Sequence, residues 1–397
     1  MAKKKFIITG TGCALADYLY SNVSFRSPTF DKYLSRRPGD GGLSPGKLVF
    51  TEELENFAGM PYPQILDELT GHNTATSFNI GGPSIVSLIH AAQMLNDDEF
   101  EVKFFGISGT DNTAERIRKL LKKTPIDFTG YLAKSTRPTP FTNVLSDPTY
   151  NNGHGERTFI NNIGAAWDLT PEVLPDDFFN SDLICFGGTA ITPNLHDNLH
   201  LLLEKAKRNG AVTFVNTVYD FRNEKINPDN PWPLGQTQLS ISYIDLLVMD
   251  HEEALKISGK SNVHDAYQFF TSAVAAFIIT HGAEPVLFYS SGKLFKKEQG
   301  TLKVSAEVTA RIHGKVYTGD TTGCGDNFAG GVLSSIAMQL NGGNRTPDLR
   351  EAVVWGICSG GYTCSYHGGT FLEEVHGEKK KAIDMLITSY KSQEELA

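Results

Sequence analysis

The sequence of 397 residues has no run of about 18 apolar residues, so it predicts no transmembrane helix. The apolar stretch at residues 6–8, behind the lysines at 3–5, is too short for the hydrophobic region of a secretory signal. An excess of positive charge is also missing, because 36 lysines and arginines stand against 45 aspartates and glutamates, a net charge of −9. An acidic chain argues against nucleic acid as a main partner. We therefore expect neither a membrane nor a nucleic-acid partner.

Cysteine is scarce as well. The chain has five cysteines, an odd number, and no two of them have CxxC spacing. This pattern argues against a disulfide framework or a structural zinc site. We expect reduced and mostly buried thiols in a cytoplasmic protein.

Several common catalytic and nucleotide-binding motifs are absent. The sequence contains no HExxH and no GxSxG, and its 11 histidines show no metal-ligand spacing. Residues 41–48, GGLSPGKL, have the glycine and lysine spacing of a P-loop, but Leu48 replaces the hydroxyl residue that would hold Mg²⁺. Residues 10–15, GTGCAL, lack the third small residue of a dinucleotide fingerprint. The two near matches therefore do not explain these glycines as a P-loop or as a dinucleotide-binding turn.

What the sequence does contain is a regular alternation of apolar strands and amphipathic helices. Strands are predicted at 5–12, 101–107, 182–188, 211–216, 243–249 and 276–282. Helices are predicted at 84–95, 112–123, 196–210, 251–259, 264–275, 326–340, 349–366 and near the C-terminus. Continuous apolar strands between helices indicate a parallel sheet that is covered on both faces. The predicted fold class is therefore α/β, with three α/β/α layers and a mostly parallel central sheet.

Two regions interrupt the alternation. Residues 126–162 contain three strand-like pieces, at 126–133, 140–147 and 156–162, which have the composition of an antiparallel β-hairpin. Residues 18–75 form an inserted segment, mixed and rich in glycine, proline and charge, with one strand-like piece at 47–53. We expect the hairpin to form a small β lid beside the main sheet. The inserted segment is either part of that lid or a surface excursion without function.

The most informative stretch is residues 318–331, TGDTTGCGDNFAGG, which an apolar run follows at once. A glycine turn that opens a helix presents free backbone N–H groups and the positive end of the helix dipole, a site for anions and above all for phosphate. A purely structural turn explains the glycines but not the threonines and aspartates among them. Asp326 lies at the mouth of this anion site, where a negatively charged side chain would repel a bound anion unless it had a function of its own. Acting as a catalytic base is the most economical such function.

The run Asp320-Thr321-Thr322-Gly323-Cys324-Gly325-Asp326 resembles the Asp-Thr-x-Gly-Ala-Gly-Asp hallmark of the ribokinase-like, or PfkB-type, carbohydrate kinases. Cys324 in place of alanine is the one departure. The resemblance implies that Gly323, Cys324 and Gly325 form an anion hole and that Asp326 is the general base. It also implies a monovalent cation such as K⁺ at Asp320 and Thr322, where some members of the family hold one.

The resemblance extends over nearly the whole chain. Residues 12–17, GCALAD, resemble the end of the family's first strand, which implies that Asp17 binds substrate hydroxyls. Residues 78–95 resemble the Gly-Gly motif that opens the first long helix, with Gly81 and Gly82 in the matching places. Val86 replaces an asparagine that usually contacts a sugar hydroxyl. The identity of the acceptor is therefore open.

Two further segments resemble the nucleotide side of these kinases. Residues 249–254, MDHEEA, resemble an Asn-x-x-Glu segment near Mg²⁺ and the phosphates, with Asp250 in the asparagine position and Glu253 matching. Residues 279–285, ITHGAEP, resemble the loop that contacts the nucleotide through Thr280 and Gly282. The cofactors implied are ATP and Mg²⁺.

The resemblance thus implies an ATP-dependent phosphotransferase that acts on a hydroxyl group of a small sugar. A nucleoside kinase of the same fold is the alternative, for which Val86 and the long segment 18–75 leave room. A non-catalytic ligand-binding homologue is disfavoured because the base and the glycines of the anion hole are present. Family members often pair through strands of the lid, so residues 126–161 are a candidate homodimer interface.

Overall fold

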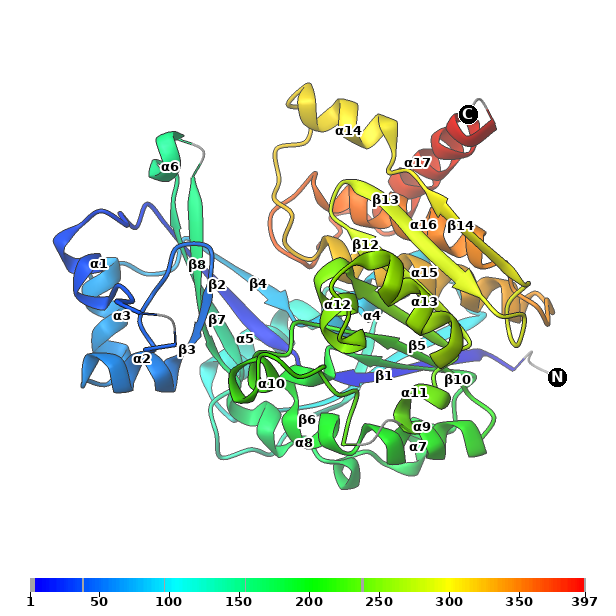
Figure 1. The fold of residues 1–397 in the computed structure, drawn as a ribbon, viewed down its shortest axis with the longest axis horizontal. Coiled ribbons are helices and arrows are strands. Elements are labelled where there is room, and N and C mark those ends of the chain that lie inside the picture. The colour runs from blue at the N-terminus through cyan, green and yellow to red at the C-terminus, as the bar shows by residue number, and fades with distance from the viewer. Residues whose placement is uncertain (1–3, 38, 96, 154, 237–238, 396–397) are drawn as a thin grey trace.

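The computed structural model describes residues 4–395 except 38, 96, 154, 237 and 238. Two sheets organise these residues: a mostly parallel sheet of nine strands and a smaller sheet of five strands at one side of it (Figure 1). This arrangement confirms the predicted α/β fold with its second small sheet. Among the described helices, none is both long enough and apolar enough to cross a membrane.

The main sheet has the strand order β14-β13-β12-β11-β10-β9-β1-β5-β6. Its strands are β1 Phe6–Gly12, β5 Phe100–Ser108, β6 Asp127–Ala133, β9 Leu183–Gly187, β10 Val212–Asn216, β11 Leu246–Asp250, β12 Ala276–His281, β13 Glu284–Ser290 and β14 Glu298–Leu302. Neighbouring strands are parallel from β12 to β6, while β13 and β14 are antiparallel at one edge. The carboxyl ends of the parallel strands therefore meet at one edge of the sheet, where ligands of such folds bind.

Helices cover both faces of the main sheet. One face packs against α4 Pro83–Met94, α5 Asn112–Leu121, α14 Ala306–His313, α15 Cys324–Asn341, α16 Leu349–Thr363 and α17 Glu378–Glu395. The other face packs against α7 Asp176–Phe179, α8 Pro193–Asp197, α9 Leu199–Arg208, α11 Leu239–Ser242, α12 His251–Ser258 and α13 Val263–Ala273. Short helix α10, Phe221–Ile226, has no buried residue.

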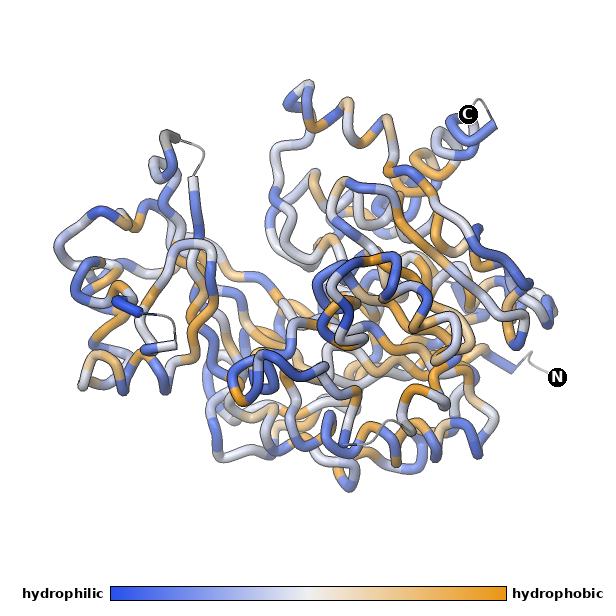
Figure 2. The backbone as a smooth tube through the Cα atoms, viewed as in Figure 1, coloured by the Kyte–Doolittle hydropathy of each residue, from blue (hydrophilic) through white to orange (hydrophobic). Residues whose placement is uncertain are grey.

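Alternating side chains of the strands supply both cores. In β11, Leu246 and Val248 belong to one core, and Leu247 and Met249 belong to the other. Because successive side chains of a strand point to opposite faces, a strand that is buried on both sides must be apolar throughout. Figure 2 shows these hydrophobic residues gathered along the central strands. This pattern is the reason that the main strands could be recognised in the sequence.

The second sheet has the order β3-β8-β7-β2-β4. Its strands are β2 Leu15–Ser21, β3 Leu48–Phe50, β4 Ser77–Gly81, β7 Phe141–Asp147 and β8 Glu156–Asn162, and α6 Tyr150–Gly153 lies in the β7–β8 connection. Helices α1 Pro28–Tyr33, α2 Thr51–Ala58 and α3 Tyr62–Thr70 lie on the outer side of this sheet, away from the main sheet (Figure 1). Leu145 and Ile160 of the sheet share a hydrophobic cluster with these helices. Most of the inserted segment is thus a helical cover for the second sheet.

Three expectations about these elements need correction. The piece 126–133 is not part of the hairpin: it forms β6, parallel to β5 in the main sheet, where the buried Tyr131 packs near Phe104. Only β7 and β8 make the antiparallel pair. The piece 47–53 is a strand for three residues and then begins helix α2 at Thr51. The helix expected at 196–210 is two helices, α8 and α9, which meet at Asn198.

Candidate active site

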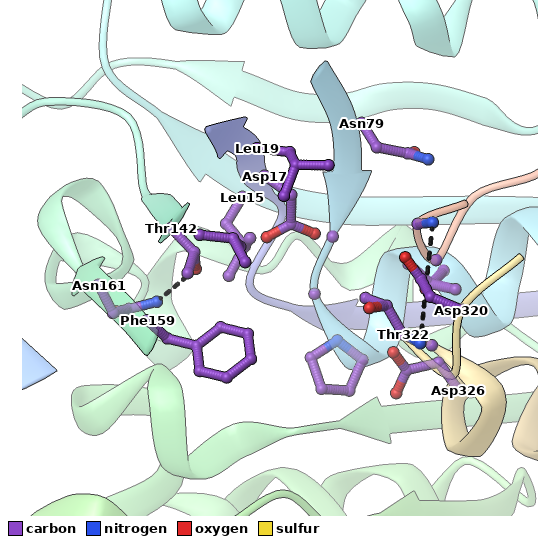
Figure 3. Close-up of a pocket in the computed structure, with 18 of the residues that line it drawn as sticks. Leu15, Asp17, Leu19, Asn79, Thr142, Phe159, Asn161, Asp320, Thr322 and Asp326 are labelled. Atoms are coloured by element: carbon purple, nitrogen blue, oxygen red, sulfur yellow. Dashed lines mark hydrogen bonds between the residues drawn. The ribbon is translucent and has the colours of Figure 1, made fainter. Parts of the chain in front are cut away.

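A cavity of about 330 Å³ lies between the two sheets (Figure 3). The second sheet contributes side chains of β2, β4, β7 and β8 to its wall. The other side of the cavity is formed by the start of α4, the turn before α15 and the loop at residues 367–369. The cavity brings together seven of the residues expected from the sequence: Asp17, Gly81, Gly82, Asp320, Thr322, Gly323 and Asp326.

The turn before α15 has the backbone conformation of an anion site. Gly323 is the N-cap with a φ of 76°, and a Cβ there would lie 2.5 Å from the Cα atom of Gly369. Glycine is therefore required on both conformational and steric grounds. In the first turn of α15 the N–H groups of Gly325 and Asp326 have no acceptor within the helix. A Cβ at Gly325 would meet no other part of the chain within 4 Å, so there is open space beside this first turn.

Cys324 has a different place from the one expected. Its backbone N–H donates to the carbonyl oxygen of Thr321 at 3.2 Å, so this N–H is already used in the turn. The free donors of the anion site are those of the next two residues. Cys324 contributes to the site as the first residue of the helix, whose dipole favours negative charge at this end.

Asp326 lies in the first turn of α15 and reaches the cavity. Burial raises the pKa of its carboxyl group from 3.8 to about 6. A carboxyl group with this pKa is mostly ionised at neutral pH and binds a proton more readily than an exposed aspartate does. It is therefore suited to accept a proton from a hydroxyl group.

Asp17 faces the same space from the second sheet. The sequence places it at the end of the first strand, but β1 ends at Gly12 and Asp17 lies within β2. Figure 3 shows the carboxylates of Asp17 and Asp326 both turned toward the cavity. Burial, together with the negative charges of Asp326 and Asp320, raises the pKa of Asp17 to about 7. The carboxylates of Asp17, Asp320 and Asp326 are therefore close enough for their charges to influence one another.

The two glycines before α4 make room for Asp17 and for the chain beside it. A Cβ at Gly81 would lie 2.2 Å from an oxygen of the Asp17 carboxylate. Gly82 has a φ of 109°, and a Cβ there would lie 2.2 Å from the carbonyl oxygen of Cys13. Glycine at these positions therefore lets the chain pass close to Asp17 and to Cys13, and the part of both glycines in substrate binding stays a prediction.

Arg157 is a site residue that the sequence did not reveal. From β8 it reaches across the cavity, and its guanidinium contacts Asp320 at 3.4 Å and the hydroxyl of Thr322 at 3.3 Å. His367 also approaches Asp320, at 3.5 Å. Among the described residues that line the cavity, Arg157 is the only lysine or arginine. The groups expected to hold a monovalent cation therefore already face a positively charged side chain.

A buried polar network holds the turn from behind. The side-chain amide of Asn327 donates to the carbonyl oxygens of Gly323 and Gly369, at 2.9 and 2.8 Å. The amide oxygen of Asn327 accepts a hydrogen bond from Lys379, which also donates to Gln93. Burial lowers the pKa of Lys379 to about 7. Because buried polar groups are costly when unpaired, this network fixes the turn in one conformation.

The expected nucleotide-side residues lie outside this cavity, at the carboxyl ends of β11 and β12. Asp250 pairs with Thr280 in the sheet register. The Asp250 and Glu253 side chains form a capping box at the start of α12. Burial, followed by the charge of Asp250, raises the pKa of Glu253 to about 7, and Asp326 adds a smaller effect. Gly282, with a φ of 54°, lies in the turn after β12.

The carboxylate of Glu253 already accepts hydrogen bonds from other groups of the protein. One of its carboxylate oxygens accepts hydrogen bonds from the Asp250 N–H at 2.9 Å and from the Thr217 hydroxyl at 2.5 Å. Within the described residues there is no cluster of three or more side chains that would hold a metal ion directly. Carboxylates in this position suit Mg²⁺ held largely through water.

Other cavity residues were also missed. Asn79 donates to the carbonyl oxygens of His367 and Thr370, and Asn161 donates to the hydroxyl of Thr142. A signal for some of them was present, because Arg157, Phe159 and Asn161 alternate along β8 and therefore share one face. The pattern indicates a shared face but not that this face would meet the anion turn.

Comparison with known proteins adds the following matches. A model of the pfkB family of carbohydrate kinases matches residues 47–375. A protein named probable fructokinase-6, chloroplastic, from Arabidopsis thaliana is 24% identical over 294 residues, 70% of each chain. A probable sugar kinase from Rhizobium etli CFN 42 has a similar structure, with a TM-score of 0.69 and 15% identity over 96% of this chain and 99% of its own. Adenosine kinase from Schistosoma mansoni, in complex with 2-fluoroadenosine, has a TM-score of 0.67 and 17% identity over 92% and 96% of the two chains.

Proposed function

The chain belongs to the pfkB family of carbohydrate kinases, and we propose that it transfers the γ-phosphoryl group of ATP to a hydroxyl group of a small sugar. As a member of this family it is a phosphotransferase with an alcohol group as acceptor. The observation that carries the finer proposal is the position of Asp326. Its carboxylate reaches the same cavity as Asp17 and stands next to free N–H groups at the start of a helix.

In this proposal the two carboxylates have different tasks. Asp17 accepts a hydrogen bond from a hydroxyl group of the acceptor and orients it. Asp326 accepts the proton of the hydroxyl group that attacks the phosphorus atom. Phosphoryl transfer demands alignment and charge neutralisation rather than covalent chemistry by the protein. Two carboxylates that face one cavity supply the alignment.

Charge neutralisation comes from two features of this chain and from the metal ion that kinases of this family use. The N–H groups of Gly325 and Asp326, with the dipole of α15, face the place where negative charge develops on the transferred group. The guanidinium of Arg157 adds a positive charge from the second sheet. Kinases of this family use ATP and Mg²⁺, and the ion would neutralise part of the phosphate charge when bound. Glu253 and Asp250 are the carboxylates that we expect to hold the ion through water.

A monovalent cation at Asp320 and Thr322 remains a prediction. Arg157 contacts both residues and competes for the same oxygens. Comparison of the kinase rate in potassium and in choline salts measures whether the ion is needed.

A nucleoside is the second candidate acceptor, and the lining of the cavity gives a specific reason. Leu19, Leu48, Val144 and Phe159 make the wall of the second sheet largely apolar, and Val86 stands where a sugar-binding asparagine is usual in the family. An apolar wall suits a nucleobase better than a bare sugar. A cavity of about 330 Å³ lies at the small end of ligand sites. Its size therefore favours a sugar.

The deciding experiment measures ADP release with ATP and Mg²⁺ across a panel of sugars and nucleosides. We expect release with at least one sugar and none above background with nucleosides. Release with nucleosides alone would replace the sugar by the second candidate. Tight binding of acceptors without any ADP release would overturn the kinase proposal in favour of a non-catalytic ligand-binding protein.

A homodimer through the lid strands and a cytoplasmic location also remain predictions. Helices α1, α2 and α3 pack on the outer side of the second sheet, around the buried Leu145 and Ile160. Pairing through that side of the sheet would require these helices to move, so the edges of the sheet are the better candidates. Light scattering during size-exclusion chromatography measures the state in solution.

A further inference from the structure

Two cysteines meet next to the anion turn. Cys324 is the first residue of α15, and Cys364 is the C-cap of α16. Their sulfur atoms are 3.7 Å apart, and both side chains are partly exposed. The other three cysteines, Cys13, Cys185 and Cys358, are buried. The pair is thus the place in this chain where two thiols are both adjacent and accessible.

The environment makes Cys364 the more reactive thiol of the pair. A hydrogen bond from the Cys324 thiol lowers the pKa of Cys364 to about 7, although burial acts in the opposite direction. A lowered pKa favours the thiolate of Cys364, and the thiolate is the nucleophilic form of cysteine. A partly exposed thiolate beside a second thiol is the arrangement found in cysteines that respond to oxidants.

We propose that Cys324 and Cys364 form a reversible disulfide that switches off the anion hole. The proposal rests on the function inferred above for residues 323–326. The oxidant is a hydroperoxide, for which hydrogen peroxide is the probe. The Cys364 thiolate attacks one oxygen, the O–O bond breaks, hydroxide leaves, and the sulfur becomes a sulfenic acid. Cys324 then loses its proton and attacks the Cys364 sulfur, and the hydroxyl group leaves as water.

The step balances, because two thiols lose two protons and two electrons while one peroxide becomes two waters. A dithiol reductant reverses the reaction by thiol–disulfide exchange. The new bond has a length of about 2.05 Å, so the sulfur atoms must approach each other by about 1.7 Å from their present separation of 3.7 Å.

We expect the backbone part of that movement to fall on the turn that precedes α15. A Cβ at Gly360 of α16 would lie 2.9 Å from the carbonyl oxygen of Cys324, so the two helices already pack closely there. Cys324 lies between Gly323 and Gly325, the residues that shape the anion hole. Closing the disulfide therefore shifts the N–H groups that face the phosphoryl group.

The test begins with mapping of the disulfide, which needs no activity assay. The full-length protein is treated with hydrogen peroxide, and peptide mass spectrometry without reduction follows the linked pair. We expect a peptide that joins residues 324 and 364 in the wild type and in the Cys358→Ala control, whose substitution lies on the same helix. Cys364→Ser must lack it, and Cys324→Ala, used only for this measurement, must lack it too. No linked peptide in the wild type would overturn the proposal.

The second reading is the kinase rate before and after oxidation. We expect the oxidised wild type to lose about tenfold or more of its rate, since displaced anion-hole donors have effects of this size or larger. Dithiothreitol should restore the rate, and Cys364→Ser should keep normal activity and resist peroxide. An equal peroxide loss in Cys364→Ser, or a linked wild type with full activity, would overturn the switch. A protein that forms the disulfide but has no kinase activity before oxidation would instead contradict the proposed function.

Discussion

The two sides of the cavity are built in different ways. On the main-sheet side, the proposed anion hole and base lie within residues 323–326 and depend on the backbone conformation of one turn. On the second-sheet side, Asp17, Asn79, Thr142 and Arg157 come from four different strands and act through their side chains. The first side can be recognised from one continuous sequence motif. The residues of the second side are far apart in the sequence and come together only when the chain folds.

This difference separates the reaction from its acceptor. A turn that offers N–H groups to a phosphoryl group serves any alcohol, so its residues identify the reaction. In the proposed function, the side chains of the second sheet contact the remainder of the acceptor and decide which alcohol is used. Changes on the main-sheet side should therefore lower the rate with every acceptor. Changes on the second-sheet side should alter the Michaelis constant or the choice of acceptor, except at Arg157, whose charge lies near the transferred group and acts on kcat.

The largest effect is expected from Gly325→Val on the main-sheet side. Its side chain would occupy the open space beside the first turn of α15, next to the N–H groups proposed to face the phosphoryl group. We expect the ATP-dependent rate to fall by about 10²–10³ with all acceptors. Gly325→Ala should have an intermediate rate, and the thermal unfolding of both variants should stay close to that of the wild type. Near-normal activity of the valine variant would refute the anion hole.

A smaller effect, confined to the acceptor, is expected from Asp17→Asn on the second-sheet side. A hydrogen bond to a charged group is worth about 1.5–3 kcal/mol, which corresponds to about 10- to 100-fold in kcat/KM for the acceptor. The Michaelis constant for ATP should stay unchanged. Steady-state kinetics with each substrate varied in turn measures both constants. An equal weakening of ATP and acceptor binding would contradict the assignment of Asp17 to the acceptor alone.

Arg157→Ala should lower kcat by about tenfold, because one positive charge near the transferred group is lost. Arg157→Lys should recover only part of the rate, since an ammonium group cannot contact Asp320 and Thr322 in the same two-pronged way. Arg26→Ala provides a control, as this arginine is exposed and outside the cavity. Wild-type kcat in Arg157→Ala would show that the guanidinium has only a structural role.

The smallest effect concerns stability. The pKa of Asp17 is raised to about 7 in the folded protein, so folding disfavours its ionised form. The resulting cost is absent well below pH 4, grows as pH rises, and is complete above about pH 7. Asp17→Asn should therefore raise the melting temperature by a few degrees at pH 8 and hardly at all at pH 4. Scanning fluorimetry at both values measures this, and an equal shift at both would contradict the raised pKa.

The same contrast explains what the sequence could predict. The central strands of the main sheet were predictable, since strands buried on both faces are apolar throughout, as in β11. The edge strands β13 and β14 were not predicted, because they are only partly buried and lack a continuous apolar run. The motif at 318–331 likewise revealed Asp326 and its glycines, because a sharp turn requires specific residues at adjacent positions. Residues 126–133 were assigned to the wrong sheet, since an alternating strand pattern does not specify its partner strand. Arg157 was missed because its meaning depends on Asp320, 163 residues away in the sequence.

The central claim is that Asp326 is the base of a phosphoryl transfer to a hydroxyl group. Its most direct test follows the phosphate monoester product by ³¹P NMR, with ATP, Mg²⁺ and the best acceptor, for the wild type and for Asp326→Asn. The account predicts product formation that is slower by at least ~10² in the variant, while thermal unfolding shows an intact fold. Product formation at the same rate in both proteins would contradict it.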